Sequence, residues 1–113
     1  MTEESQVLIW QADVTHPKQA ADAKEALRDV IDPEIGLNII ELGLIRDVIV
    51  NDDGVHINMI LTTPFCPYGP ALLEMARKRV EESLEQTTTI EIGMQSWDPT
   101  MMEEGVGADW GLF

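Results

Sequence analysis

The chain of 113 residues is predicted to fold as an α+β domain, a two-layer sandwich in which helices cover one face of a small sheet. The prediction depends on the order of its patterns. A helical pattern comes first, two strand patterns joined by a short turn follow, and a second helical pattern precedes a last strand. The order is therefore α-β-β-α-β. The sheet is a three-stranded mixed sheet if the second helix crosses over between two parallel strands.

The first helix is expected to begin at Pro17, because proline suits the first turn of a helix. It follows an N-terminal arm over residues 1–16, whose apolar patch is able to add a strand or to lie against a neighbouring subunit. Apolar residues then recur at helical spacing. The helix should end before Pro33, since the residue before a proline avoids the α region. Residues 32–43 form a loop of mixed acidic and apolar character.

Two strands joined by a hairpin turn follow this loop. Residues 44–50 are rich in β-branched side chains, which favour strands. The sequence Asn51-Asp52-Asp53-Gly54 has the composition of a tight turn. Over residues 55–62, side chains alternate between the two faces of a strand, and this alternation is the clearest strand signal in the chain.

A second helix and a third strand complete a domain that spans residues 17–97. The helix begins near residues 68–70 and carries an apolar stripe as far as Leu84. Residues 87–97 alternate as a strand does, and the segment over residues 98–113 is expected to be a tail that packs on the domain or on a partner. The methionines at core positions of these patterns are Met59, Met75 and Met94.

The composition excludes several classes of function. The chain has 21 acidic and 7 basic residues and a net charge of −14, and such a surface repels phosphate backbones and anionic membranes. Neither a nucleic-acid nor a membrane partner is expected. A KH-like RNA-binding module is also disfavoured, because no Gly-x-x-Gly loop with basic neighbours is present. The acidic N-terminus does not fit a signal peptide, and a single thiol fits the reducing cytoplasm.

The only cysteine, Cys66, lies between the second strand and the second helix. A thiol at a helix start faces unpaired backbone N–H groups, which favour the thiolate, and the thiolate is both a nucleophile and a metal ligand. A nucleophile needs a base within reach. His56 lies roughly 20 Å from Thr62 along the same strand, and nothing places His16 near the cysteine. A Cys–His hydrolase is therefore disfavoured, and no enzymatic activity is expected.

Two interpretations of Cys66 remain open from the residues alone: a buried structural cysteine or a metal ligand. The loop after the first helix offers Asp32, Glu34 and Glu41 as further ligands. One thiolate with carboxylates is too small and too hard a set for a tight zinc or cluster site, so it suits a labile, shared or dimer-bridged site. The residues expected to support the cysteine loop, by capping the helix, bonding the thiolate or limiting how the loop bends, are Thr62, Thr63 and Pro67.

Four motifs occur in a fixed order along the chain: Asp32-Pro33-Glu34-Ile35, residues 38–45, residues 62–67 and Trp97-Asp98-Pro99. Together they resemble the SufT/PaaD-type family of small iron–sulfur assembly proteins, whose eukaryotic members serve cytosolic cluster targeting. The resemblance covers about residues 17–113. It implies an α+β domain like the C-terminal domain of NifU-type scaffolds. It also implies a maturation or transfer factor for iron–sulfur proteins, which is not an enzyme.

The resemblance places the family's cysteine at Cys66 and its acidic pair at Asp32 and Glu34. The family's Asp-Leu-Gly appears as Glu41-Leu42-Gly43, one methylene longer. The tail departs from the family, since no Lys or Arg follows Arg79.

The resulting hypothesis is an accessory factor for the assembly of iron–sulfur clusters or their delivery to client apoproteins. Cys66 would transiently bind iron or a cluster, and Asp32, Glu34 and Glu41 would complete or tune that site. A homodimer would bring two thiolates together and supply missing ligands. The cofactor is expected to be a labile cluster or iron, with none tightly bound. The alternative is a protein-interaction adaptor that binds no metal.

Overall fold

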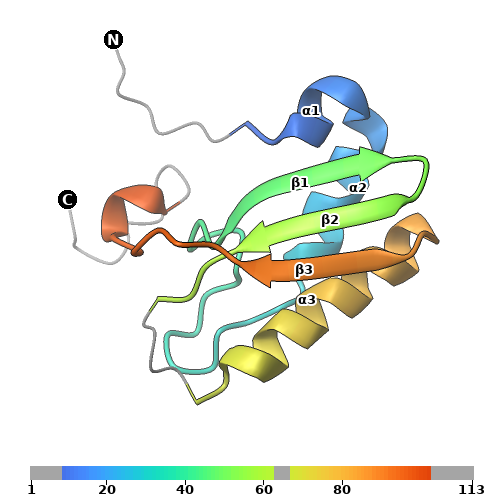
Figure 1. Ribbon diagram of the computed structural model, residues 1–113. Helices are drawn as coiled ribbons and strands as arrows, with labels where there is room; N and C mark the ends of the chain where they lie inside the picture. Colours follow the sequence, from blue (N-terminus) through green and yellow to red (C-terminus); the bar gives the residue numbers. More distant parts are fainter. Residues whose placement is uncertain (1–8, 63–66, 103–113) are drawn as a thin grey trace, which may run out of the picture.

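The computed structural model describes residues 9–62 and 67–102, and it confirms the predicted α+β class (Figure 1). Two longer helices lie on one face of a three-stranded sheet, with a short additional helix before them. The elements are, in chain order, α1 (Gln11–Thr15), α2 (Pro17–Leu27), β1 (Ile45–Asn51), β2 (Gly54–Met59), α3 (Gly69–Leu84), β3 (Thr88–Ile92) and the 3-10 helix η1 (Pro99–Met101).

The sheet has the strand order β1-β2-β3. β1 and β2 are antiparallel and joined by the predicted hairpin turn, whereas β2 and β3 are parallel and joined by α3. Met59 of β2 pairs with Ile45 on one side and with Ile92 on the other. The start of β1 and the ends of β2 and β3 therefore lie together at what we call the site end of the sheet. The opposite end, which contains the turn over residues 51–54, is the hairpin end.

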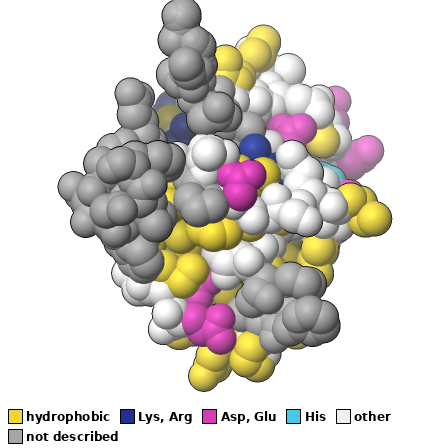
Figure 2. All heavy atoms as spheres, turned by 90° about the vertical axis from the view of Figure 1, so that its left-hand side faces the viewer, with side chains coloured by type: hydrophobic (Ala, Val, Ile, Leu, Met, Phe, Trp, Pro, Cys, Tyr) yellow, Lys and Arg dark blue, Asp and Glu magenta, His cyan; other side chains and the backbone are white. Residues whose placement is uncertain are grey.

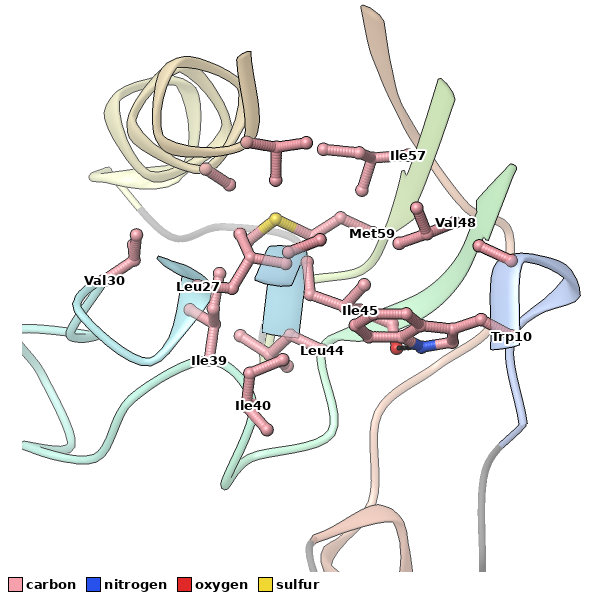
Figure 3. Packing of buried hydrophobic residues seen from close by; sticks show 14 of the residues in the cluster. Trp10, Leu27, Val30, Ile39, Ile40, Leu44, Ile45, Val48, Ile57 and Met59 are labelled. Atoms are coloured by element: carbon pink, nitrogen blue, oxygen red, sulfur yellow. Dashed lines mark hydrogen bonds between the residues drawn. The ribbon is translucent and has the colours of Figure 1, made fainter. Parts of the chain in front are cut away.

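A hydrophobic core fills the space between the helices and the sheet. Its buried helix positions recur every three or four residues, so one stripe of each helix faces the sheet. These positions are Ala20, Ala23 and Leu27 in α2, and Leu72, Ala76 and Val80 in α3. The strands contribute alternate residues, as predicted, and Figure 3 shows Met59 in the middle of the cluster.

The N-terminal segment also takes part in the core. Trp10 is only 2% exposed, and its indole N–H donates a 3.2 Å hydrogen bond to the carbonyl of Ile45 (Figure 3). The backbone and side-chain amides of Gln11 both donate to Asp47, each at 2.8 Å. The ammonium of Lys24 lies 5.1 Å from the centre of the Trp10 ring. Trp10, which belongs to the predicted arm, thus packs on its own domain and adds no strand to the sheet.

Two predicted strands are longer than the strands observed. The patterns over residues 55–62 and 87–97 predict strands that continue past Met59 and Ile92, where β2 and β3 end. A strand is defined by a hydrogen-bonded neighbour, and Met59 and Ile92 are the last residues paired with each other. The alternation of side chains therefore continues beyond the ladder.

The first long helix ends before Pro33, as predicted, whereas two methionines differ from the prediction. α2 ends at Leu27, well before Pro33, because the chain turns there and the carbonyl of Val30 accepts a hydrogen bond from the N–H of Ile39. Met75 and Met94 are exposed, since Met75 lies off the buried stripe of α3 and Met94 follows the end of β3. None of the described helices is long and apolar enough to cross a membrane.

Candidate functional site

The site end of the sheet brings together motifs that are far apart in the sequence. The loop over residues 30–44 leads directly into β1, whose first residue pairs with the last residue of β2. The segment that contains Cys66 leaves from this end of β2, and Trp97 follows the parallel end of β3. The three motifs that the structure describes in full, together with Thr62 and Pro67 at the borders of the fourth, therefore belong to segments that meet at one end of the domain. Figure 2 looks onto this end, where hydrophobic and acidic side chains lie next to one another.

The loop over residues 30–44 is held in shape by its own polar groups. The N–H of Asp32 donates to the carbonyl of Leu37 at 2.9 Å, closing a small turn. Further along, Asn38 and Glu41 satisfy each other's backbone: the Glu41 N–H donates to Asn38 Oδ1 at 2.7 Å, and the Asn38 N–H donates to Glu41 Oε1 at 3.1 Å. This reciprocal arrangement is that of a capping box at a helical turn. Hydrogen bonds within the loop thus fix its conformation.

Asp32 is the most unusual side chain of this loop. It is 1% exposed, and its Oδ1 accepts a 2.9 Å hydrogen bond from the backbone N–H of Glu34. Its Oδ2 is buried and has no hydrogen-bond partner within the described residues. No other buried side-chain nitrogen or oxygen there lacks a partner. Because a buried acceptor without a partner is costly, Oδ2 is the atom of this loop that is available to a donor or a cation.

The other two acidic residues have different surroundings. Glu34 is exposed in the turn after Asp32, so it faces solvent. Glu41 is half-buried, and one of its carboxylate oxygens holds the backbone of Asn38. Glu41 therefore positions the loop, and only its second oxygen remains for a ligand.

The predicted thiolate segment is described only at its borders, because Cys66 and Thr63 lie outside the described residues. Thr62, before the segment, is half-buried, and Pro67, after it, is exposed. α3 begins at Gly69 without a side-chain hydrogen bond at its cap. Its first N–H groups are therefore left to other partners. A Cβ on Gly69 would lie 2.8 Å from Cδ1 of Leu61, so glycine lets the helix start approach the chain that follows β2.

The C-terminal motif packs directly on the loop, a contact that the sequence did not predict. The indole N–H of Trp97 donates a 2.7 Å hydrogen bond to the carbonyl of Leu42. Gly43 has a φ of 75°, and a Cβ there would lie 1.9 Å from the carbonyl oxygen of Met101. Only glycine combines this positive φ with so close an approach. The glycine of one motif thus lies against the backbone of the segment that follows another motif, Trp97-Asp98-Pro99.

Arg46 links the same two segments electrostatically. Its Nη1 donates to the carbonyl of Gly43 at 2.9 Å and its Nε to Gln95 Oε1 at 3.3 Å. Partial burial lowers the pKa of Arg46, and the nearby carboxylate of Asp98 acts in the opposite direction. The pKa of Asp98 is lowered, first by the hydroxyl and backbone N–H of Thr100, which donate to it, and less by Arg46. The hydrogen bonds of Arg46 thus connect the loop before β1 with the segment that follows β3.

The donor set of the described site is small. Over residues 9–62 and 67–102, no three His, Cys, Asp or Glu side chains are grouped so that they could hold a metal ion. Arg46 is the only Lys or Arg of the chain between residues 29 and 76. The unpartnered acceptor that a cation at this end would meet is Asp32 Oδ2.

Comparisons with known proteins agree on one family. The family model described as iron-sulfur cluster assembly protein matches residues 20–92. The Fe-S protein maturation auxiliary factor YitW of Bacillus subtilis is 40% identical over 65 residues, 57% of this chain but only 64% of that relative. The Fe-S protein maturation auxiliary factor SufT of Staphylococcus aureus is 40% identical over 72 residues, 62% of this chain and 78% of that protein. A domain of unknown function from Bacillus anthracis shares the fold, with a TM-score of 0.77 at 21% identity over 88% of this chain and 98% of that one.

Proposed function

Because the chain belongs to the iron–sulfur cluster assembly protein family, we propose that it is an accessory factor that helps to assemble iron–sulfur clusters or to deliver them to client proteins. The cluster or its iron is the cargo and binds only transiently. The chain itself catalyses no reaction. It acts in the cytoplasm, where thiols stay reduced and a free thiolate persists.

The observation that carries this proposal is the unpartnered Oδ2 of Asp32. A buried carboxylate oxygen without a donor is stabilised when a cation or an N–H or O–H group reaches it. This oxygen belongs to the loop that enters the sheet at the site end. The segment with Cys66 leaves β2 at the same end. A thiolate and an open carboxylate oxygen there would form part of an iron site.

The chain supplies too few ligands to hold a cluster alone, and this favours transfer of the cluster over its storage. Iron–sulfur clusters are held by several thiolates, and this chain supplies one. Cys66, Asp32 and Glu34 would bind the cargo, with Glu41 tuning the loop. The remaining ligands would come from a second copy of the chain or from the client. A site that needs the client's ligands releases its cargo to that client as those ligands bind.

Anaerobic reconstitution with ferrous iron and sulfide tests this function. Wild type, Cys66→Ala and Asp32→Asn are compared with Asp52→Asn, a matched loss of one carboxylate at the exposed hairpin turn. We expect Cys66→Ala and Asp32→Asn to retain at least about tenfold less iron in the presence of a chelator, as loss of a ligand or its support does. Asp52→Asn should retain as much as wild type. Equal iron retention by wild type and Cys66→Ala would disprove the ligand role.

A transfer assay separates the carrier from the adaptor that binds no metal. Reconstituted protein is mixed with an apoenzyme whose activity needs a cluster, and the recovered activity is measured. A carrier with Cys66→Ser should lose transfer, whereas an adaptor with the same change keeps its clients and their maturation. Retained maturation with no bound iron at any stage would assign the adaptor role.

A further inference from the structure

Over residues 9–62 and 67–102, nothing pairs with the outer edge of β3, so this edge is open for a further strand. β3 pairs only with β2 within the described residues, in parallel. The carbonyl of Thr87 accepts from Val55, and the N–H of Gly93 donates to Met59, each at 2.8 Å. Backbone N–H and C=O groups alternate in direction from one residue of a strand to the next. The N–H and C=O groups of residues 88, 90 and 92 therefore point away from β2. The edge therefore presents the N–H and C=O groups of three alternate residues.

Only the first of these three residues is covered. The N–H of Thr88 donates to Glu81 Oε2 at 3.1 Å, and its carbonyl accepts from Arg77 Nη1 at 3.3 Å. No hydrogen bond joins the outward groups of Ile90 and Ile92 to the described parts of the chain. Two α3 side chains thus close the edge near the hairpin end and leave it open towards the site end. Unpaired strand edges are templates for an added strand.

Apolar side chains accompany the open groups. Ile92 is 55% exposed and Met94 is 99% exposed. Arg77 lies beside Thr88, and α3 and β3 run in opposite directions. Leu73, one helical turn before Arg77 in α3, and Ile90 of β3 are both partly buried hydrophobic residues that pack against the core. We call the apolar surface formed by Leu73, Ile90 and Ile92 the strip beside the open edge. An added strand would cover this strip with its own apolar side chains.

The negative charge at this edge favours some binding partners over others. Glu91 lies between the two open residues, its side chain is 60% exposed, and it contacts His56 of β2 at 3.3 Å. If two copies paired antiparallel through Ile90 and Ile92, their Glu91 side chains would stand directly opposite each other. Such a like-charge pair is destabilising, and each copy carries a net charge of −14. A second copy is therefore a poor occupant, and a segment with a basic residue facing Glu91 is a good one.

We propose that the outer edge of β3 is a docking site for an extended basic segment of a partner protein. The segment adds a fourth strand and bonds to the outward N–H and C=O groups of Ile90 and Ile92. Its alternate apolar side chains pack against the strip that includes Leu73, and a Lys or Arg faces Glu91. This site is separate from the Asp32 loop and does not depend on metal binding.

An NMR titration of the full chain tests the site. The probe is a blocked seven-residue peptide in which lysine alternates with valine. We expect the amide signals of Ile90, Ile92 and their neighbours to shift. The same peptide with alternate backbone nitrogens methylated should bind at least about tenfold more weakly, because it cannot complete the ladder. A peptide that alternates glutamate with valine should not bind.

Matched variants locate the contact. Glu91→Lys should weaken binding of the lysine peptide about fivefold or more. Asp52→Lys makes the same charge change at the exposed hairpin turn and should leave binding within about twofold. Ile92→Pro removes one outward N–H without removing a bond to β2, and should abolish binding in a chain that remains folded by circular dichroism.

Two results would overturn the proposal. Equal binding of the plain and the methylated peptide would mean that only the general negative charge attracts it. Concentration-dependent dimers in sedimentation equilibrium, lost in Ile92→Pro, would mean that the edge is occupied by a second copy.

Discussion

The two ends of the sheet differ in how completely they satisfy their own polar groups. At the hairpin end, Asn51 Oδ1 accepts from Asp53, and the Asn51 carbonyl accepts from Gln86. The buried hydroxyl of Thr88 donates to the carbonyl of Gln86 at 3.0 Å. At the site end, Asp32 keeps a buried oxygen without a partner in the described structure. The hairpin end stabilises the fold, whereas the site end retains an acceptor that the fold does not use.

Among the described residues, each end also contains one glycine that lies against a backbone carbonyl. A Cβ on Gly54 would lie 2.3 Å from the oxygen of Thr87, just before the neighbouring strand. A Cβ on Gly43 would lie 1.9 Å from the oxygen of Met101, in the C-terminal segment. The glycine of the hairpin end lets β2 pack closely against the residue that precedes β3. The glycine of the site end joins the loop to a separate segment, so its loss should affect the site specifically.

The largest expected effect is that of Gly43→Ala. The side chain would clash with the Met101 carbonyl at a positive φ, and we expect a loss of about 3 kcal/mol in the free energy of unfolding. The indole N–H signal of Trp97 should shift as its bond to Leu42 breaks. Gly36→Ala is the matched control, since Gly36 has a φ of 88° but nothing within 4 Å of an added Cβ. It should cost only about 1 kcal/mol. Equal costs would show that the C-terminal segment does not press on the loop.

A smaller effect separates stability from function at the two ends. Thr88→Val removes a buried hydrogen bond and should lower the free energy of unfolding by about 1 kcal/mol, without changing iron retention. Asp32→Asn keeps the Oδ1 acceptor and replaces the buried, unpartnered Oδ2. Its stability should stay within about 0.5 kcal/mol of wild type or rise, although iron retention falls. Urea unfolding measures both. A large loss of stability in Asp32→Asn would make Asp32 a structural residue.

The fold was predictable wherever a local pattern was long enough. α3 follows its apolar stripe, and β2 follows its alternation, because burial of one face imposes a period on the sequence. The ends of β2 and β3 were not predictable, since they depend on where each strand stops pairing with the other. Trp10 was assigned to an arm because α1 spans only 5 residues, too few to show a period.

The sequence motifs name candidate site residues, whose ligand roles stay predictions, but not the arrangement of these residues in space. The motifs identify Asp32 and Glu41, and the positive φ of Gly43 agrees with its place after a short turn. The burial of Asp32 and the bond from Trp97 to Leu42, 55 residues apart, arise from the tertiary fold. No spacing rule in a single sequence brings those two segments together. The proposed ligand role of Cys66 stays a prediction.

The smallest expected effect concerns pH and the attachment of the C-terminal segment. Donation from Thr100 lowers the pKa of Asp98 below its ordinary value of 3.8, so the folded state favours the carboxylate. This contribution is complete above the ordinary pKa and is lost as the pH falls through the lowered one. Asp98→Asn should therefore lower the Tm slightly at pH 7, by about 1 °C, and the difference from wild type should shrink as the pH falls below the ordinary pKa of Asp98. Thr100→Val should give a smaller difference with the same direction of pH dependence, because the backbone N–H of residue 100 still donates to Asp98 after the hydroxyl is lost. A difference that persists unchanged in acid would show that Asp98 acts through packing and that its charge does not hold the segment.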